Sequence, residues 1–219
     1  VGGIDWNERN FHGYTTERGS TYNAYLIMDE KITLIDTCKR PFVDELIERI
    51  GTIVDPAKID YIVSNHVEMD HSGGLPALAE IAPNATIVTG APKGVAGLTA
   101  HYGDGLNLRG VKTGDTLDIG RRTLTFVQTP MVHWPDSMVT YDEYDQILFS
   151  NDSFGQLAIS TKAEVLDENR QPVPGLYAGG TIANAELFYL RYAVSGASMC
   201  MGTVTGRIAA QEAMRYYGA

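Results

Sequence analysis

Short apolar runs alternate with polar turns along the first half of the chain, and they predict strands and helices in turn. Two apolar runs, Thr21–Met28 and Ile32–Thr37, flank the polar triplet 29–31, which indicates a β-hairpin. Pro41–Ile50 predicts a helix, because proline suits a first helical position and Phe42, Leu46 and Ile50 fall on one stripe. We expect further strands over 58–64 and 85–90, and a helix over 75–82.

Strands dominate the pattern after Gly110. The stretch Gly110–Pro130 predicts two strands joined at Ile119–Gly120, and a further hairpin is expected around Glu143–Asp145. The alternation of helices and strands, followed by a strand-rich part, is typical of a mixed α/β fold.

The pattern of polar and apolar residues changes near Ala158. A polar hairpin and a short strand lead into Ser195–Tyr217, which predicts a long helix with the small residues Gly202 and Gly206 in one line. We therefore expect two parts, residues 1–157 and residues 158–219. The second part either completes the first or forms an appended unit.

The stretch SNHVEMDHSGG, Ser64–Gly74, places four potential metal ligands directly after an apolar run: His66, Glu68, Asp70 and His71. Carboxylates at the end of a buried strand are unfavourable unless something positive neutralises them. His133 and Asp152 follow two other predicted strands. A lone His or Asp is ordinarily a surface or hydrogen-bonded residue, but this combination predicts a metal pocket.

The choice of metal follows from Glu68. Zinc hydrolases with this layout read HxHxDH, and here a carboxylate stands where they have the second histidine. Oxygen ligands move the preference from zinc toward iron or manganese. Glu68, Asp70 and Asp152 contribute three negative charges, which suits two divalent ions bridged by a carboxylate and a hydroxide.

Composition narrows the classes of function. The 219 residues are 44% hydrophobic, with a net charge of -10 and a pI near 4.9, which argues against nucleic acid or an anionic membrane as partner. Cys38 and Cys200 form neither a disulfide framework nor a CxxC pair. We expect a cytoplasmic protein, with no membrane span or signal peptide. Val1 in place of Met indicates a processed or truncated sequence.

Residues 1 to about 156 resemble the metallo-β-lactamase-like half of flavodiiron proteins, the oxygen and nitric oxide reductases. The resemblance rests on five stretches, and the form HxExDH within them is the mark of that family. The stretches are IDWNERNFHGYTTERGSTYNAYLIMDEKITLIDT, DYIVSNHVEMDHSGGLP, VKTGDTL, TPMVHWPDSMVTY and LFSNDSFGQ. The resemblance implies an αββα sandwich, either incomplete or completed by an unusual C-terminal segment.

The same resemblance implies roles for the candidate residues. It makes His66, Glu68 and His133 ligands of one iron, Asp70 a ligand of a second iron, and Asp152 the bridge. His71 would lie beside the second iron, where members of the family differ. His12, in NFHGY, would lie near the pocket as a catalytic candidate.

The chain also departs from the family. No histidine follows His133, so the family's last ligand to the second iron is absent, and we expect lower occupancy there. His101 is expected on the surface. The family's FMN-carrying flavodoxin domain is absent too, so the electrons would come from an external flavodoxin- or rubredoxin-like donor. A homodimer is one candidate assembly.

The tail resembles a different family. STKAEVLDENRQPVPGLYAGGT and SGASMCMGTVTGRIAAQEA are similar to the C-terminal part of FAD-dependent fumarate reductase and succinate dehydrogenase-type flavoproteins. A helix beginning near Ser195 would suit a reduced flavin. No GxGxxG follows a strand to hold the dinucleotide phosphates, so we expect neither FMN nor FAD in the isolated chain.

The leading hypothesis is a non-haem di-iron protein that binds and reduces dioxygen or nitric oxide with external electrons. One alternative is an oxygen-binding sensor module without turnover. The other is a metal-dependent hydrolase of the metallo-β-lactamase superfamily, against which Glu68 argues.

Overall fold

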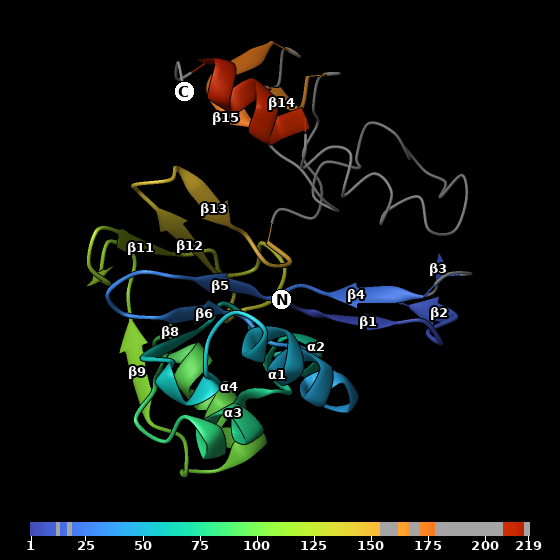
Figure 1. Ribbon diagram of the computed structural model, residues 1–219, viewed down its shortest axis with the longest axis vertical. Coiled ribbons are helices and arrows are strands. Elements are labelled where there is room, and N and C mark those ends of the chain that lie inside the picture. The colour runs from blue at the N-terminus through green and yellow to red at the C-terminus, as the bar shows by residue number, and fades with distance from the viewer. Residues whose placement is uncertain (12–13, 17–18, 154–161, 167–170, 178–207, 217–219) are drawn as a thin grey trace. The chain divides into compact units, whose positions relative to one another are not determined.

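The computed structural model describes residues 1–219 except 12–13, 17–18, 154–161, 167–170, 178–207 and 217–219 (Figure 1). The chain forms two compact units. The first comprises Val1–Asp5 and Thr21–Ser153, and the second comprises Trp6–Ser20 and Phe154–Ala219.

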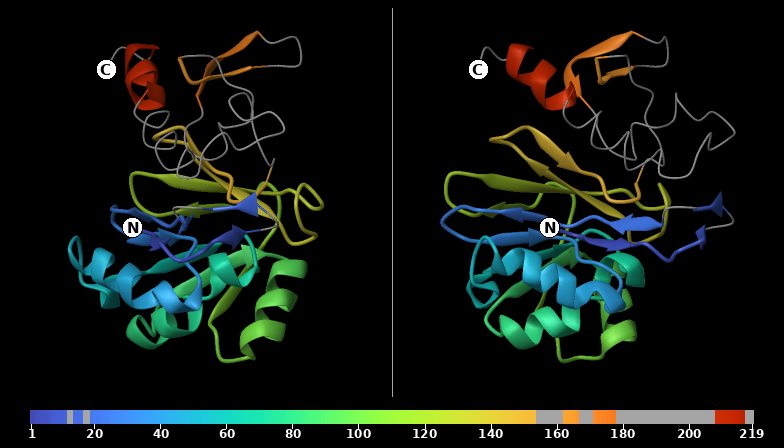
Figure 2. Two further views of the ribbon diagram at one scale, coloured as in Figure 1. Left: turned by 90° about the vertical axis from the view of Figure 1, so that its right-hand side faces the viewer. Right: turned by 45° about the vertical axis from the view of Figure 1, so that its right-hand side comes forward.

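The first unit is built on a five-stranded sheet covered by helices on one face (Figures 1 and 2). Its strand order is β5 (Tyr25–Ile27), β6 (Thr33–Ile35), β7 (Tyr61–Ser64), β8 (Thr86–Gly90) and β9 (Leu108–Val111). The predicted hairpin is confirmed, because β5 and β6 are antiparallel, while β6 to β9 run parallel. The covering helices are α1 (Val43–Gly51), α2 (Met69–Ser72), α3 (Leu75–Ile81) and α4 (Lys93–Tyr102), with the 3-10 turns η1 (Arg40–Phe42) and η2 (Pro56–Lys58).

Apolar side chains on the helices explain this packing. Leu46 and Ile50 of α1 and Leu75 and Leu78 of α3 are fully buried, in a cluster that includes Ile62 of β7. The stripe predicted for 41–50 therefore faces the sheet. Its first residues form η1 before the α-helix begins at Val43.

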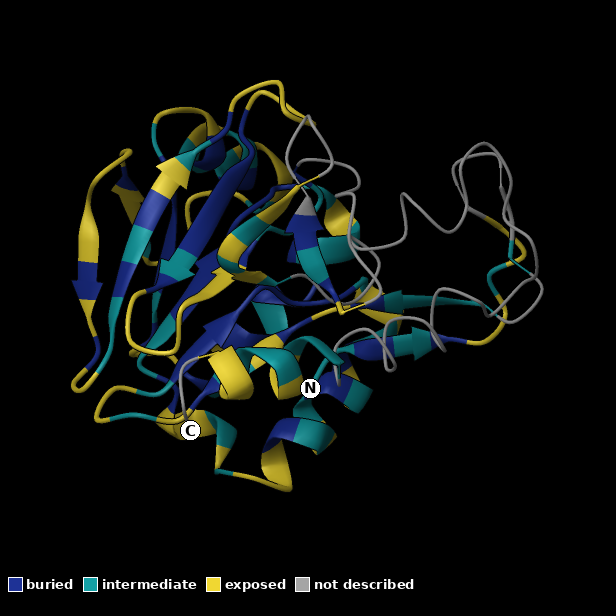
Figure 3. Ribbon diagram, turned by 90° about the horizontal axis from the view of Figure 1, so that it is seen from above, coloured by how far each residue is buried: buried dark blue, intermediate teal, exposed yellow. Residues whose placement is uncertain are grey.

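A second, antiparallel sheet packs on the other face of the first. It contains β10 (Thr116–Asp118), β11 (Thr123–Gln128), β12 (Met138–Asp142) and β13 (Ile147–Phe149), in that order. Alternate residues of β11, Leu124 and Phe126, point inward and join Ile35, Val63 and Val88 of the first sheet in one buried cluster. The unit is thus a layer of helices and two face-to-face sheets, and the buried residues along its strands are dark blue in Figure 3.

Two predicted strands are divided differently in the structure. The run 21–28 breaks into β4 (Ser20–Tyr22), which pairs with β1 (Gly3–Asp5), and β5. The beginning of 110–130 belongs to β9 in the first sheet, and only β10 and β11 form the expected hairpin, with Gly120 at φ +123° in the turn. An apolar run indicates a strand but does not say which sheet the strand joins.

The described residues of the second unit form two hairpins and a helix. One hairpin pairs β2 (Asn10–Phe11) with β3 (Tyr14–Thr15), and the other, predicted as polar, pairs β14 (Glu164–Leu166) with β15 (Pro172–Tyr177). Residues 208–216 are helical, within the predicted range 195–217. Cys200, Gly202 and Gly206 lie outside the described residues. Among the helices that are described, none is long and apolar enough to cross a membrane.

Candidate metal centre

Three strand ends of the first unit bring the predicted ligands together. His66 and Glu68 follow β7, and the short helix α2 then carries Asp70 and His71. His133 lies in the loop between β11 and β12, and Asp152 follows β13. The site therefore forms where one strand of the first sheet and two of the second end near one another.

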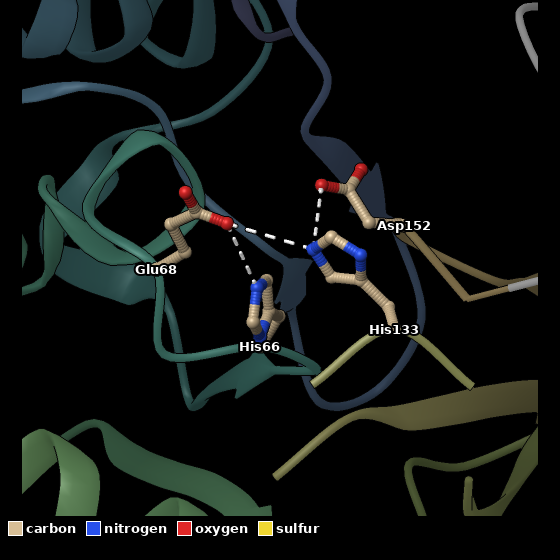
Figure 4. Close-up of side chains that lie close together, drawn as sticks. All are labelled: His66, Glu68, His133 and Asp152. Carbon is tan, nitrogen blue, oxygen red and sulfur yellow. Dashed lines mark hydrogen bonds and ion pairs between the residues drawn. The ribbon is translucent and has the colours of Figure 1, made fainter. Parts of the chain in front are cut away.

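Four of the six predicted residues form one tight group (Figure 4). His66, Glu68, His133 and Asp152 each offer one ligand atom, and these atoms lie within 4.8 Å of one another. Glu68 Oε2 is 3.2 Å from His66 Nε2 and 3.6 Å from His133 Nε2. His133 Nε2 is also 3.7 Å from Asp152 Oδ2. Two imidazole nitrogens and two carboxylate oxygens at such separations are a donor set for iron, manganese or zinc.

Asp70 and His71 adjoin this group on the side of Asp152. His71 Nε2 lies 3.1 Å from Asp152 Oδ2 and 3.5 Å from Asp70 Oδ2. Asp70 Oδ1 is buried and, in the part of the chain that the structure describes, has no hydrogen-bond partner. A buried carboxylate oxygen without a donor is costly, so this atom fits a site that holds a cation.

The carboxylates make the site favour positive charge. Burial lowers the pKa of His71, but its hydrogen bond to Asp152 and the charges of Asp70 and Asp36 outweigh burial and raise that pKa to about 9. Burial likewise lowers the pKa of His66, and hydrogen bonds to Asp136 and Glu68 raise it overall. Either an imidazolium or a metal ion can supply the charge that these acids require.

Two buried networks that the sequence analysis did not single out hold the ligand loop. Asp136 Oδ2 lies 2.9 Å from His66 Nδ1 and accepts a hydrogen bond from the Val67 amide at 2.9 Å. Asp36, at φ 55°, accepts hydrogen bonds from the amide and the side chain of Asn65, at 2.8 and 3.0 Å.

The Asn65 side chain also joins the two sheets, because its Oδ1 accepts a hydrogen bond from Thr140 Oγ1 of β12 at 2.7 Å. The available signal for Asp36 was its place at the end of the apolar run ITLID. For Asp136 it was proximity to His133 in HWPDS.

Two further histidines, His12 and His101, had been given other places from the sequence. His12 lies outside the described residues. His101 lies on α4 and is exposed, as expected. Trp134 is an aromatic neighbour of the cluster: its ring lies edge-to-face with His66 at 5.1 Å between centroids and is stacked with His133 at 6.1 Å.

A layer of helices on two packed sheets, with a histidine- and carboxylate-rich group at the strand ends, defines a metallo-β-lactamase-like domain. A family model described as "ODP family beta lactamase" matches residues 21–207, and the chain belongs to that family. The first unit corresponds to the metallo-β-lactamase-like di-iron domain of flavodiiron proteins, on the similarities that follow.

The curated relatives and the solved structures that the chain resembles point to the same family. The chain is 48% identical over 159 residues to a nitric oxide reductase of Moorella thermoacetica, covering 71% of this chain and 40% of the relative. It is 50% identical to the solved rubredoxin oxygen:oxidoreductase of Desulfovibrio gigas, with a TM-score of 0.66, covering 71% of this chain and 39% of that one. For the flavodiiron protein of Giardia intestinalis the identity is 46%, the TM-score 0.66 and the coverage 71% and 38%. The chain spans about two fifths of the length of the curated relatives that it matches.

Proposed function

We propose that this chain is a non-haem di-iron protein that binds dioxygen or nitric oxide and reduces it with electrons from an external donor. The observation that carries the proposal is the group of four ligand atoms within 4.8 Å, in which Glu68 stands beside two histidines. Similar proteins are named nitric oxide reductase and rubredoxin-oxygen oxidoreductase.

Within this proposal, His66, Glu68 and His133 would hold one iron, and Asp152 would be shared with a second. Asp70 would bind the second iron with His71 beside it, and the family resemblance makes His12 a catalytic candidate. The shared contacts of Glu68 Oε2 with the two imidazoles, and the unpartnered Asp70 Oδ1, support this division. Two ferrous ions would supply one electron each and Lewis acidity to a bound diatomic molecule.

The protein's own side chains would balance the charge of the ions and hold a proton beside them. Glu68, Asp70 and Asp152 offset the charge of two divalent ions, and the burial of His66, 1% exposed, lowers the local dielectric around its ring. His71, poised between Asp70 and Asp152, can hold a proton at Nε2 or release that nitrogen to a metal.

We further propose that residues 1–157 form the di-iron domain and that 158–219 form a strand–helix segment of flavoprotein-like sequence. The first compact unit ends at Ser153, which supports a boundary near 157, and the curated relatives align over 159 to 163 residues, although the family model continues to residue 207. No FMN or FAD is expected in the isolated chain. A flavodoxin- or rubredoxin-like protein would supply electrons, with cytoplasmic location and a homodimer as parts of the same proposal.

Metal content and oxygen consumption test the proposal together. After iron-replete expression we expect up to two irons per chain, with the second position emptying first during mild chelation, because no histidine follows His133. Chemically reduced protein should consume oxygen once, and repeated turnover should require an added electron carrier. Iron without any reaction would favour the sensor alternative. Zinc as the sole metal, with ester hydrolysis, would favour the hydrolase. A flavin spectrum at one per chain would contradict the expected absence of flavin.

A further inference from the structure

One buried carboxylate connects the two loops that carry most of the predicted ligands. Asp136 lies in the loop between β11 and β12, three residues after His133, and only 6% of its side chain is exposed. Its Oδ2 reaches across to the loop after β7, where it meets both the His66 ring and the Val67 amide at 2.9 Å.

We propose that Asp136 is a positioning residue that fixes His66 with hydrogen on Nδ1 and the lone pair of Nε2 directed at the metal. The inference rests on the proposed function, since it assigns His66 as a ligand.

The hydrogen-bond geometry sets the tautomer. The Val67 amide can only donate, so Asp136 Oδ2 is the acceptor of that bond. An ionised carboxylate accepts from the ring as well, which requires hydrogen on His66 Nδ1. Both ring nitrogens face a carboxylate, Nδ1 at 2.9 Å from Asp136 and Nε2 at 3.2 Å from Glu68 Oε2. A neutral imidazole carries one N–H, and we assign it to Nδ1 because that contact is shorter and its acceptor is buried and held by the Val67 amide, whereas the Glu68 side chain is 23% exposed and can turn toward a cation. The lone pair of Nε2 is then left for a metal.

The same oxygen also places Glu68. Val67 stands between the two alternating ligands, and its amide is held by Asp136, so the turn that presents His66 and Glu68 together is fixed at its centre. A second tie lies nearby, because the Met138 amide donates to the Asn65 carbonyl at 2.9 Å. The loop that carries His133 is thereby held against the loop that carries His66 and Glu68.

Asp136→Ala and Asp136→Asn distinguish a role in orienting His66 from the general contribution of a buried carboxylate to stability. Alanine removes the acceptor, so the His66 ring loses its preference for hydrogen on Nδ1. Asparagine keeps an oxygen that can accept both hydrogen bonds but removes the charge that makes His66 a stronger ligand. Asp29→Asn is the matched control, because Asp29 is also a buried carboxylate that accepts backbone amides and a charged side chain, at the turn between β5 and β6.

The test combines nitrogen-15 NMR of the His66 ring in metal-free protein, at a pH where the ring is neutral, with anaerobic ferrous iron titration. We expect hydrogen on Nδ1 in the wild type and in Asp136→Asn, and its shift toward Nε2 in Asp136→Ala. Iron affinity should fall about 10- to 100-fold in Asp136→Ala, and less in Asp136→Asn. Asp29→Asn should leave tautomer and affinity unchanged.

Hydrogen on Nε2 in the wild type, or an unchanged tautomer in Asp136→Ala, would overturn the inference. If Asp136→Ala does not fold, the test rests on the tautomer of the wild type and on the iron affinity of Asp136→Asn. An iron affinity of Asp136→Asn equal to that of the wild type would then contradict the role proposed for Asp136. Failure of the wild type to bind iron would instead contradict the proposed function, while the tautomer of the metal-free protein still tests Asp136.

Discussion

Two groups of acidic side chains lie at opposite ends of β11 and β12, and they satisfy their charge in different ways. At one end, Asp29, Asp142 and Asp145 surround Arg122, whose side-chain nitrogens lie 3.0, 3.4 and 2.7 Å from their oxygens. At the other end, the carboxylates of the candidate metal centre meet only imidazoles and amides among the described residues, and Asp70 Oδ1 has no partner there.

The difference shows that the role of an acidic cluster depends on what supplies its neutralising positive charge. Where the chain supplies its own guanidinium, the acids are paired, and the cluster joins the turn after β5 to the turns of the second sheet. Where the chain supplies titratable histidines instead, the requirement for positive charge remains, and a metal ion can meet it. The first arrangement is expected to act on stability, and the second on metal binding.

The largest expected effect is the loss of metal in Glu68→Ala. Its Oε2 contacts both His66 and His133, so the substitution removes one proposed ligand and the link between two others. We expect iron affinity to fall by about two orders of magnitude or more, measured by metal analysis after dialysis against a weak chelator.

Glu80→Ala and His101→Ala are the controls for that experiment. Glu80 is an exposed glutamate on α3, and His101 is an exposed histidine on α4. Surface changes of this kind usually stay within about 0.5 kcal/mol of neutral, and both variants should keep their iron. Equal retention of iron in Glu68→Ala would remove the distinction between the two acidic groups.

The candidate metal ligands could be predicted from the sequence, but the Arg122 cluster could not. That His66, Glu68, His133 and Asp152 lie together could be predicted, because each follows an apolar run and strand ends meet at the edges of sheets. For Asp136 the sequence offered only its proximity to His133, and it could not show that its partner is His66, which is 70 residues away and is brought close only by the packing of the two sheets. The Arg122 cluster was missed for the same reason, since Asp29 lies 93 residues from it. The sheet to which β9 belongs is likewise decided by tertiary pairing.

A smaller effect is expected from Arg122→Met, which removes the internal cation and leaves three carboxylates together. Removing one partner of a buried pair costs about 3–5 kcal/mol, and the partial exposure of Arg122 reduces the expected loss of unfolding free energy to about 1–3 kcal/mol. Urea unfolding measures this loss, with Arg109→Met, an exposed arginine on β9, as the control. Iron content should stay at the wild-type level, and a loss of iron with the fold intact would show that the two groups are not independent.

The smallest expected effect is a pH-dependent loss of stability in Asp29→Asn. Hydrogen bonds from the amide of Arg121 and from Glu30 and Arg122 lower the pKa of Asp29 to about 2, against an ordinary value of 3.8. Because the folded-state pKa is depressed, this carboxylate stabilises the fold fully above the ordinary value, and the contribution is lost as the pH falls toward 2. The urea midpoint of Asp29→Asn should therefore lie below that of the wild type at pH 7, and the gap should narrow between about pH 4 and pH 2. Asp104→Asn, an exposed aspartate between α4 and β9, controls for the loss of a surface charge. A gap that stays constant across this range would mean that Asp29 acts through its shape and not through its charge, and the contrast between the two acidic groups would then rest on Arg122 alone.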